Sequence, residues 1–558
     1  MSKFLNFFKL IPRPFLFSIL SGLLIGTSYI PFSGWFLLVC YAPLWLATLE
    51  LQNEQASYKK IFFIGWISQF ILTLIGFNWI YYVASEFGQL PWFICVGALF
   101  LFAAFMHLYI PISLVLGVWL IRKFKVDGAL RSLLVFAITL ALLERIWPSI
   151  FEWNLAYTLL WIKLPLFQWA DTVGFWGLST WILVIQAIIS WGLLSLRNES
   201  DHRQSSSASS RNSSPSRLNS IVAFGSCFTF ILVMTGLGIL KQKQWAATDQ
   251  QVNFGLVQGH VGNQDKLLAE KQSQYHTYLL GLYADMTEKL LATHPETEIV
   301  IWPETAMPFP LDPAYQPRPA PQQLLQRVIA WNRPLITGAY SIDPARLDHL
   351  GYPLTSNSVF FISEQGKMIG SPYNKSDLLV FGEYMPLGEH LQFLYQLFPF
   401  VGTYKRGDGP TVYEVPLKDK VVRIGAEICY ESLNPGFSRN LAKKGSQIFF
   451  NVTNDSWFGW WAEPYQHGTM TLGRAIEIRR PLVRSTNSGV SSVILADGTQ
   501  LTHSGIDVPF AYTYEVKYLE NPPLSFYTRF GHWDWLVWLL ALIGLLIYND
   551  RKGSHVYN

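Results

Sequence analysis

The sequence predicts two parts: an α-helical domain that crosses a membrane several times, and a mixed α/β domain held outside the cytoplasm. Composition is the first indication, because 50% of the 558 residues are hydrophobic and only 14% are charged. Soluble domains carry about a quarter charged residues. Hydropathy patterning is the second, since long apolar runs fill residues 14–240 and one more lies near the C-terminus, with the polar residues gathered between them.

Seven apolar runs in the N-terminal part reach or approach the length of about 20 residues that a helix needs to cross a bilayer. They cover residues 14–32, 35–50, 60–82, 92–121, 130–148, 165–195 and 219–240. Lys3, Lys9 and Arg13 precede the first run, as in a signal peptide, but no small-residue cleavage site follows, so we expect an uncleaved helix.

The last apolar run, 533–548, is short enough to be a buried core helix. The Arg551-Lys552 pair that follows it and its aromatic flank favour an eighth span instead. Basic residues of short loops stay cytoplasmic, and Lys59-Lys60 and the basic loops 122–131 and 197–217 fall on one side of a seven-span count. We therefore expect residues 241–530 to lie outside the cytoplasm.

These patterns divide the chain into three parts. We predict a membrane domain at 1–243, an external domain at 244–528, and a transmembrane helix with a short cytoplasmic tail at 529–558. The Ser-rich stretch 198–219 cannot bury a core, so we expect it to be a disordered cytoplasmic loop.

Charge and cysteine usage exclude several classes of protein. A net charge of +4 is too small to predict a nucleic-acid surface. Cys40, Cys95 and Cys227 lie in apolar runs, which leaves Cys429 alone in the polar part. No Cys-x-x-Cys or Cys/His ligand spacing occurs, so the sequence predicts neither a disulfide framework nor a zinc site.

The external segment alternates strand-like and helical patterns, which predicts a layered mixed sheet. Strands are expected at 252–257, 298–302, 334–340, 356–362, 421–428, 447–451, 482–486 and 490–495. Helices are expected at 271–293, 322–331, 437–444 and 465–479.

Three stretches of this segment place a chemically useful side chain near the end of a predicted strand, where active-site residues commonly lie. Glu304 follows the apolar run 299–303, Lys375 precedes Glu383 by eight residues, and Cys429 ends the run 424–428. Taken singly, each has an ordinary explanation: a solvated Glu, a surface Lys, a Cys that fills the core.

Taken together, in this order, Glu304, Lys375 and Cys429 resemble the Glu-Lys-Cys triad of the nitrilase superfamily. Further motifs are similar to its apolipoprotein N-acyltransferase branch: Phe-Gly-Glu-Tyr at 381–384, Cys-Tyr-Glu at 429–431, Thr-Asn-Asp-Ser-Trp-Phe-Gly at 453–459, Gln-His at 466–467 and Arg-Ser-Thr-Asn-Ser-Gly at 484–489. Seven spans, an external domain and a closing span also match that family, so the resemblance covers nearly the whole chain.

The resemblance implies a nitrilase-like αββα sandwich and a two-step acyl transfer. An acyl chain of a membrane phospholipid would form a thioester on Cys429 and then pass to the α-amino group of the diacylglyceryl-cysteine of an apolipoprotein. Neither a metal nor an organic cofactor is called for. The protein would be a monomer in a bacterial inner membrane, with its catalytic domain in the periplasm.

The residues take roles in that chemistry. Cys429 needs a base, because a free thiol has a pKa near 8.5 and the thiolate is the nucleophile; Glu304 is the candidate. Lys375 and the peptide N–H of Tyr430 would bind the oxyanion. The family resemblance also implies supporting roles for Glu383, beside Lys375 or the incoming amine, and for Glu431, in ordering the loop after the nucleophile.

Other motifs have structural interpretations. Arg474 and Glu477 lie three residues apart on a predicted helix and are expected to pair, and 453–455 is expected to be a turn at the pocket wall. The apolar segments 393–400 and 457–461 fit equally a protein core or a membrane interface that admits acyl chains.

Three departures from the family pattern bear on lipid or acceptor preference. They are Ser-Asp-Leu-Leu-Val at 376–380, His-Val-Gly-Asn at 260–263, and Leu267 in place of an aromatic residue.

Two other functions stay open on the sequence alone. The triad also suits a membrane-tethered amidase that uses water as the acceptor. A catalytically idle lipid-binding scaffold is the second alternative, although retention of all three triad residues argues against it.

Overall fold

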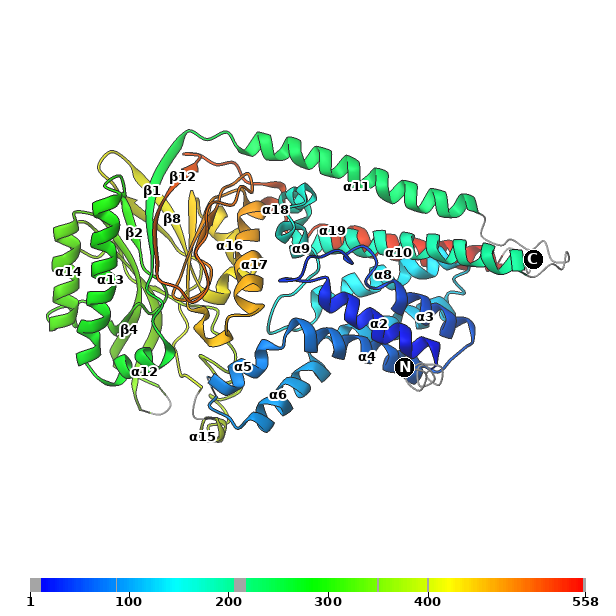
Figure 1. Cartoon of the computed structure of the whole chain (residues 1–558), viewed down its shortest axis with the longest axis horizontal. Coiled ribbons are helices and arrows are strands. Elements are labelled where there is room, and N and C mark those ends of the chain that lie inside the picture. Colours follow the sequence, from blue (N-terminus) through cyan, green and yellow to red (C-terminus); the bar gives the residue numbers. More distant parts are fainter. Residues whose placement is uncertain (1–11, 87, 205–216, 349–350, 399–400, 555–558) are drawn as a thin grey trace, which may run out of the picture.

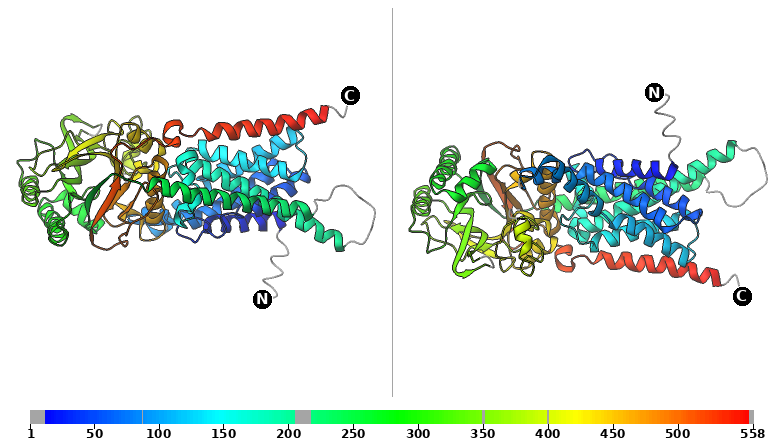
Figure 2. Two further views of the ribbon diagram at one scale, coloured as in Figure 1. Left: turned by 90° about the horizontal axis from the view of Figure 1, so that it is seen from above. Right: turned by 90° about the horizontal axis from the view of Figure 1, so that it is seen from below.

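The computed structural model describes residues 12–86, 88–204, 217–348, 351–398 and 401–554. A helical bundle and an α/β sandwich lie end to end along the long axis (Figure 1). The views from above and below show the long helices of the bundle running away from the sandwich, with the end of the last helix at the far side (Figure 2). The predicted class, a multi-span helical domain joined to an α/β domain, is confirmed.

The bundle is built from apolar helices. They are α2 (Arg13–Thr27), α3 (Ala42–Asn53), α4 (Tyr58–Gly76), α5 (Trp79–Glu86), α6 (Trp92–Phe105), α7 (Tyr109–Lys123), α8 (Ala129–Ile146), α9 (Tyr157–Trp161), η1 (Pro165–Trp169), α10 (Ala170–Gln204), α11 (Arg217–Trp245) and α19 (Asp534–Ser554).

Within the described residues, four apolar helical stretches have the length and hydropathy of a membrane span: Tyr58–Gly76, Trp92–Lys123, Pro165–Arg197 and Arg217–Trp245. Arg13–Thr27 and Asp534–Tyr548 are apolar but shorter. The predicted span 35–50 is wrong at its start, because residues 35–41 form turns before α3 begins.

The predicted span 92–121 is interrupted between α6 and α7, at residues 106–108. Pro111 supplies the reason, because a proline ring clashes with the carbonyl group four residues earlier, here that of His107.

The prediction of a disordered loop at 198–219 is wrong at both ends, since α10 continues to Gln204 and α11 begins at Arg217. Residues 205–216 lie outside the described part.

Two mixed sheets face each other in the sandwich. One runs in the order β12 (Phe510–Tyr518), β1 (Gln250–Gln258), β2 (Ile299–Ile301), β4 (Leu335–Leu347), β5 (Pro353–Ile362) and β6 (Tyr373–Asn374), with β3 (Met307–Pro310) also on β4. The other runs in the order β11 (Ser492–Ile494), β10 (Leu482–Thr486), β9 (Ile448–Thr453), β8 (Val421–Ile428) and β7 (Val412–Pro416).

Alternation along β5 shows why the sheets stack. Phe361 faces the second sheet, with its ring 4.0 Å from that of Tyr413 and 5.6 Å from that of Phe450. Its neighbour Phe360 points the other way, into a separate apolar cluster. Because successive strand residues face opposite sides, one run fills both the space between the sheets and the space under the outer helices.

Helices cover the outer faces of the two sheets, which gives the expected αββα order (Figure 1). The first sheet carries α12 (Asn263–Lys271), α13 (Gln274–Thr293) and α14 (Pro319–Trp331); the second carries α16 (Pro435–Lys443) and α17 (Glu463–Ile478). The short helices α15 (Phe393–Leu397) and α18 (Phe526–Phe530) lie in connections. The predicted helix 271–293 is confirmed as α13, which begins three residues later, and α12, β3, β6, β7 and β12 were not predicted.

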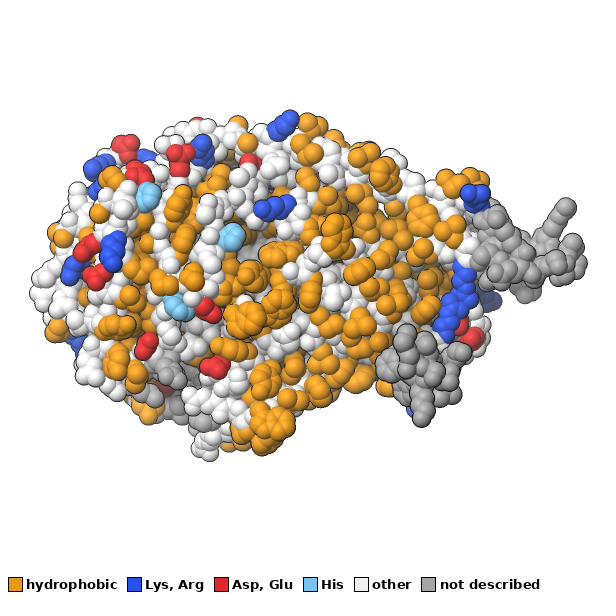
Figure 3. Space-filling model, in the orientation of Figure 1, with side chains coloured by type: hydrophobic (Ala, Val, Ile, Leu, Met, Phe, Trp, Pro, Cys, Tyr) orange, Lys and Arg blue, Asp and Glu red, His pale blue; other side chains and the backbone are white. Residues whose placement is uncertain are grey.

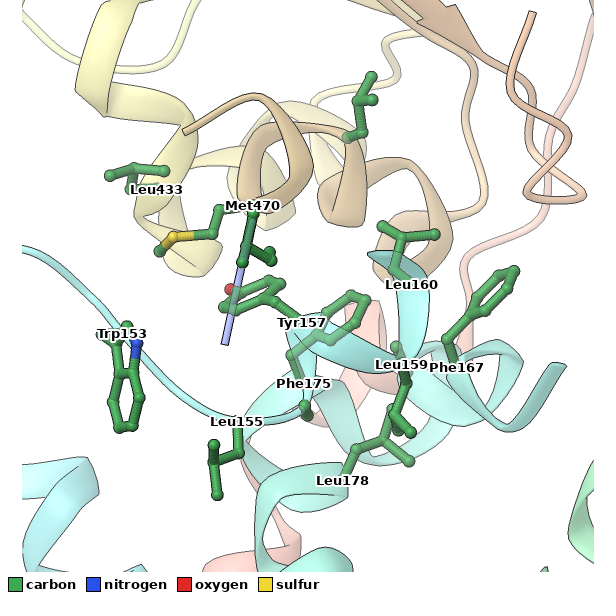
Figure 4. Close-up of a cluster of buried hydrophobic side chains, with 14 of the residues drawn as sticks. Trp153, Leu155, Tyr157, Leu159, Leu160, Phe167, Phe175, Leu178, Leu433 and Met470 are labelled. Carbon is green, nitrogen blue, oxygen red and sulfur yellow. The ribbon is translucent and has the colours of Figure 1, made fainter. Parts of the chain in front are cut away.

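Helix α17 joins the sandwich to the bundle. Its residues other than Tyr465 are buried, because one face packs on the second sheet and the other on the membrane helices. Met470, together with Leu433, meets the cluster of Trp153, Tyr157 and Phe175 from the bundle (Figure 4).

Polar side chains of α17 and its C-cap cross the same boundary. The side-chain amide of Gln466 donates to the carbonyl oxygens of Ile30 (2.8 Å) and Gly76 (2.9 Å). Arg474 pairs with Glu477 at 3.0 Å, as expected, and also donates to the hydroxyl of Tyr157. These contacts give Gln466, Arg474 and Glu477 polar partners, and burial without any partner would be more costly.

An ion-pair cluster fixes the other end of α17. Asp171, at the start of α10, accepts hydrogen bonds from the guanidinium group of the C-cap residue Arg479 at 2.9–3.0 Å and from the ammonium group of Lys241 at 2.7 Å. Arg479 is 1% exposed. One carboxylate therefore holds α10, α11 and α17 together.

Replacing Asp171 with Leu should destabilise the fold strongly, because it leaves the buried Arg479 without its counter-ion; breaking such a pair costs about 3–5 kcal/mol. Thermal unfolding in detergent measures this. The matched control is Glu288→Gln, which removes the half-exposed partner of Arg327 and should change stability by no more than about 0.5 kcal/mol. Equal effects of the two substitutions would show that Asp171 does not hold the three helices together.

Candidate active site

Glu304 lies in the loop after β2, close to the backbone of β4. A Cβ atom added to Gly338 of β4 would lie 2.5 Å from the carbonyl oxygen of Pro303 and 2.7 Å from the Cα of Glu304. Real Cβ atoms do not approach this closely, so glycine at 338 lets the loop that carries Glu304 rest directly on the sheet.

Glu304 is held by hydrogen bonds to both carboxylate oxygens. The side-chain amide of Asn357 donates to Oε1 at 2.6 Å, and the peptide N–H of Asn454 donates to Oε2 at 2.8 Å. The ammonium group of Lys375 lies 3.5 Å from Oε1. Burial raises the pKa of Glu304, against the opposing effect of Lys375.

Lys375, just past β6, is 1% exposed and bridges two carboxylates. Its Nζ lies 2.8 Å from Oε2 of Glu383 and 3.5 Å from Glu304. Asn357 donates to Glu383 as well, at 3.0 Å, and so does the peptide N–H of Leu379, at 2.8 Å. Burial lowers the pKa of Lys375, but Glu383, Cys429 and Glu304 together raise it well above its usual value, so the ammonium form persists.

Cys429 ends β8 and begins the short helix η2 (Cys429–Leu433) with a φ of +53°, a left-handed conformation that non-glycine residues rarely adopt. Its carbonyl oxygen accepts hydrogen bonds from Asn451 and Ser432, both at 3.0 Å. Such strained residues persist where the surroundings over-determine them, and they gather at active sites. The sharp turn from strand to helix is thus built around the predicted nucleophile.

The thiol of Cys429 is 5% exposed. Burial and the Glu304 carboxylate raise its pKa well above the usual value, while Lys375 opposes this. The thiol is therefore protonated at rest, and it needs a base in order to react. Glu304 and Lys375 both act electrostatically on Cys429, so the structure brings the three predicted triad residues together.

Glu431 closes the turn after Cys429. Its carboxylate accepts the peptide N–H groups of Ile428 at 2.8 Å and Ser376 at 2.6 Å, and the hydroxyl of Tyr373 at 2.7 Å. Burial raises its pKa to about 7, although these donors lower it. One carboxyl group therefore ties the nucleophile loop to the segment that follows Lys375, and Ser376, a departure from the family pattern, takes part.

Residues 453–455 contribute more than the predicted turn. The peptide N–H of Asn454 holds Glu304, as described above. Asp455 is fully buried in an ion pair with Arg484 at 2.8 Å and contacts His467 at 3.0 Å. Despite burial, Arg484 and His467 lower the pKa of Asp455 to about 2. The motif therefore shapes the pocket wall and, in addition, holds Glu304 through a backbone hydrogen bond.

Sequence reasoning missed Asn357, the N–H of Asn454, and Lys266. Lys266 is 5% exposed, and its ammonium group contacts the carbonyl oxygen of Glu304 at 3.3 Å and the hydroxyl of Thr305 at 3.2 Å. Asn357 interrupts a strand that turns apolar two residues later, and a buried amide in such a strand is the one signal that could have drawn attention to it. The side chain of Leu267 lies outside the described side chains.

The two apolar segments divide between core and surface. Tyr395 and Phe458 are buried, whereas Phe393, Leu397 and Trp460 are more than half exposed. Residues 399–400 lie outside the described part of the chain. Neither of the two interpretations holds for a whole segment.

Comparisons with known proteins place this site in a family. The carbon-nitrogen hydrolase model matches residues 240–507, and the model for the N-terminal domain of apolipoprotein N-acyltransferase matches residues 21–188. The apolipoprotein N-acyltransferase of Bdellovibrio bacteriovorus is 45% identical over 555 residues, which cover 99% of this chain and 97% of that protein. The chain belongs to the apolipoprotein N-acyltransferase family. This confirms the resemblance noted in the sequence.

Two further comparisons show lower similarity. The apolipoprotein N-acyltransferase of Geobacter metallireducens is 29% identical over 564 residues, covering 98% of each chain. Among solved structures, the nitrilase-superfamily protein Nit3 of Saccharomyces cerevisiae is 17% identical, with a TM-score of 0.35 over 48% of this chain and 91% of that one.

The reactivity of Cys429 should fall as pH falls. Because the pKa of Glu304 is raised, this carboxylate becomes protonated at a higher pH than an ordinary glutamate and can then no longer accept the thiol proton. The rate of alkylation by iodoacetamide, followed by intact mass against the Cys429→Ala variant, should therefore show an acid limb above pH 4.5. In Glu304→Gln the limb should vanish and the rate at neutral pH should drop about a hundredfold or more. An unchanged acid limb in Glu304→Gln would assign the titration to another group.

Proposed function

We propose that this protein transfers an acyl chain from a membrane phospholipid to the α-amino group of the diacylglyceryl-cysteine of an apolipoprotein, through a thioester on Cys429. Family membership over nearly the whole chain is the observation that carries the proposal. The site itself supports it, because a buried thiol, a carboxylate of raised pKa and a persistent ammonium group lie together beside membrane helices.

The first half-reaction begins with the thiol of Cys429 giving its proton to Glu304 as sulfur attacks the ester carbonyl of the phospholipid. The carbonyl π electrons move to oxygen and form a tetrahedral oxyanion. When the carbon–oxygen bond to glycerol breaks, Glu304 returns the proton to the leaving oxygen. The products are the acyl thioester and a lysophospholipid.

In the second half-reaction the amine of the acceptor gives a proton to Glu304 and attacks the thioester carbonyl. The carbon–sulfur bond breaks, the amide forms, and Cys429 regains a proton. Lys375 and the peptide N–H of Tyr430 are our candidates for binding the oxyanion in both halves; removing one such donor typically costs about a hundredfold to a thousandfold in rate. Glu383 keeps Lys375 charged and in place, as their 2.8 Å contact supports.

The choice of a lipid donor rests on the neighbours of the nucleophile loop. The ring of Tyr430, next to Cys429, lies 5.3 Å from the ring of Phe151, which belongs to the bundle. An amidase of soluble substrates has no need of membrane helices at its nucleophile. Aromatic side chains there also exclude water, which would otherwise complete a hydrolysis.

We propose further that the bundle lies in a bacterial inner membrane with the sandwich in the periplasm, divided as 1–243, 244–528 and 529–558. Lysine and arginine side chains gather at the end of the bundle farthest from the sandwich (Figure 3), as expected of a cytoplasmic end. All triad residues come from one chain, which supports a monomer as the working unit.

Purified protein mixed with phospholipid alone should release one equivalent of lysophospholipid and gain the mass of one acyl chain on Cys429. Hydroxylamine should remove this mass, and an apolipoprotein with a free diacylglyceryl-cysteine amine should discharge it. Intact-mass analysis measures all three. Cys429→Ala should fold and gain no mass, whereas the matched control Cys227→Ser, in α11, should behave as the wild type.

Other outcomes of this experiment identify the alternatives. Release of free fatty acid without an acceptor, and without a lasting adduct, would identify a hydrolase. Lysophospholipid release that strictly requires the acceptor, with no adduct at any time, would replace the covalent route by direct transfer.

Topology can be tested with reporter fusions. A reporter inserted after Lys125 should behave as cytoplasmic, and one inserted after Ser363, in the sandwich, as periplasmic, because the basic loops fix the orientation. A cytoplasmic signal from the Ser363 fusion would reverse the proposed orientation.

A further inference from the structure

We propose that Glu463 is a positioning residue for the acyl transfer, acting through the hydroxyl of Tyr430 on the peptide N–H that follows Cys429. The inference deepens the proposed function and rests on it. Glu463 is the first residue of α17, the helix that joins the sandwich to the membrane helices.

Tyr430 has three aromatic neighbours and a hydrogen bond at its hydroxyl group. One face stacks on the imidazole of His467, with ring centroids 4.5 Å apart and planes within 9° of parallel. The rings of Phe458 and Phe151 lie at 5.5 and 5.3 Å. The hydroxyl donates a hydrogen bond to Oε1 of Glu463. Aromatic packing alone permits sliding in the ring plane, so the hydrogen bond is the contact that fixes the ring along its long axis.

The position of the ring matters because Tyr430 follows Cys429, whose backbone is in the strained left-handed region. The peptide N–H between them is our candidate oxyanion donor. An effective donor lies about 2.7–3.1 Å from the position that the oxyanion will occupy. Fixing the far end of the tyrosine side chain restrains the backbone at its near end.

Glu463 is suited to hold a neutral phenol. It is 2% exposed, and burial together with Asp455 raises the pKa of its carboxyl group well above the usual value. Nδ1 of His467 lies 3.7 Å from Oε1, and Arg484 is engaged by Asp455 at 2.8 Å. Burial and Asp455 therefore favour the neutral acid form of Glu463, which can accept from Tyr430 with one oxygen and donate with the other.

A small cavity lies between the bundle and the sandwich, and Glu463 is one of the residues that line it. Four polar atoms of the residues that line it are buried and have no hydrogen-bond partner among the described residues: Oη of Tyr29, Nε1 of Trp153, Oε2 of Glu463 and Nε2 of His467. The cavity offers about 20 Å³ to the centre of a water molecule.

These atoms come from both parts of the molecule. Tyr29 and Trp153 belong to the bundle, whereas Glu463 and His467 belong to α17. Three residues beyond Glu463, Gln466 fixes α17 to the carbonyl groups of Ile30 and Gly76. The membrane helices therefore set the position of Glu463, and Glu463 sets that of Tyr430. Arg484, Asp455 and His467 complete a polar network that gives Glu463 one orientation.

The test compares Glu463→Gln with Glu463→Leu in the full-length protein with phospholipid as the acyl donor. Leu keeps the approximate volume but cannot accept from Tyr430, so the acylation rate of Cys429 should fall about tenfold to a hundredfold, the loss expected of a displacement near 1 Å. The KM for phospholipid should stay unchanged. Gln resembles the neutral acid and should restore most of the rate. Quenched-flow intact mass gives the rate, and thermal unfolding gives the folded fraction.

Tyr430→Phe removes the same hydrogen bond from its other end and keeps the test valid where Glu463→Leu folds poorly. As a single substitution it should lower the acylation rate by a similar factor. The double variant should be no slower than either single variant, because both remove one interaction. Additive losses in the double variant would overturn the inference.

Glu427→Leu is the matched control. Glu427 is also a fully buried carboxyl near the nucleophile, but it bonds to Ser438 rather than to Tyr430. Its replacement should lower stability and leave the acylation rate of the folded protein close to that of the wild type. Two outcomes would overturn the inference but not the proposed function. They are a Glu463→Gln variant as slow as Glu463→Leu, and a Glu463→Leu variant as fast as the wild type. A wild-type protein that forms no adduct would overturn the proposed function and the inference with it.

Discussion

The burial of α17 on both of its faces is the constraint on which the rest of the structure depends. Burying a polar side chain without a partner is costly in this position, yet the helix carries Glu463, Gln466, Arg474 and Glu477. Each can be buried only because a partner stands across the boundary or along the helix, such as the carbonyl groups at Ile30 and Gly76. Separating the bundle from the sandwich would therefore expose apolar surface and would also remove the partners of these polar groups.

This constraint reaches the nucleophile through short connections. Beneath Cys429, Asn451 binds its carbonyl oxygen and Arg484 binds Asn451 at 2.6 Å. Arg484 also holds Asp455, whose carboxylate lies so near Gly489 that a Cβ atom there would approach it to 2.0 Å. The strained backbone of Cys429 is thus supported from below by a buried ion pair and from the side by Tyr430. Strain at an active site persists under such over-determination.

Much of this could be predicted from the sequence, for physical reasons that differ between elements. The apolar runs and β1, β8 and β10 follow directly from periodicity, which is strong where a strand is buried on both faces. β7 and β12 escaped because they are stabilised by antiparallel pairing with β8 and β1 rather than by a local pattern. The interruption at 106–108 depends on one proline inside an otherwise continuous run.

The residues of the site also divide into those with a local sequence pattern and those that depend on contacts between distant segments. Glu304, Lys375 and Cys429 could be proposed because each stands at the end of a strand with distinctive neighbours. Asn357 and the N–H of Asn454 could not, because their role comes from the side-by-side placement of distant segments. Glu463 has no local signature at all, since its importance depends on the burial of α17 against helices more than three hundred residues earlier in the chain.

The charges of the site limit the order of its chemical events. Two carboxyl groups, those of Glu304 and Glu383, lie around the single ammonium group of Lys375. A thiolate formed by losing its proton to solvent would add a negative charge to a desolvated pocket, which is what the raised pKa of Cys429 expresses. When the thiol proton passes to Glu304 as sulfur attacks, that carboxylate becomes neutral while the new negative charge forms on the substrate oxygen, so the total charge of site and substrate stays constant. Loss of the thiol proton to solvent before the attack is therefore disfavoured in this pocket, and Glu304 is the acceptor that keeps the charge balanced.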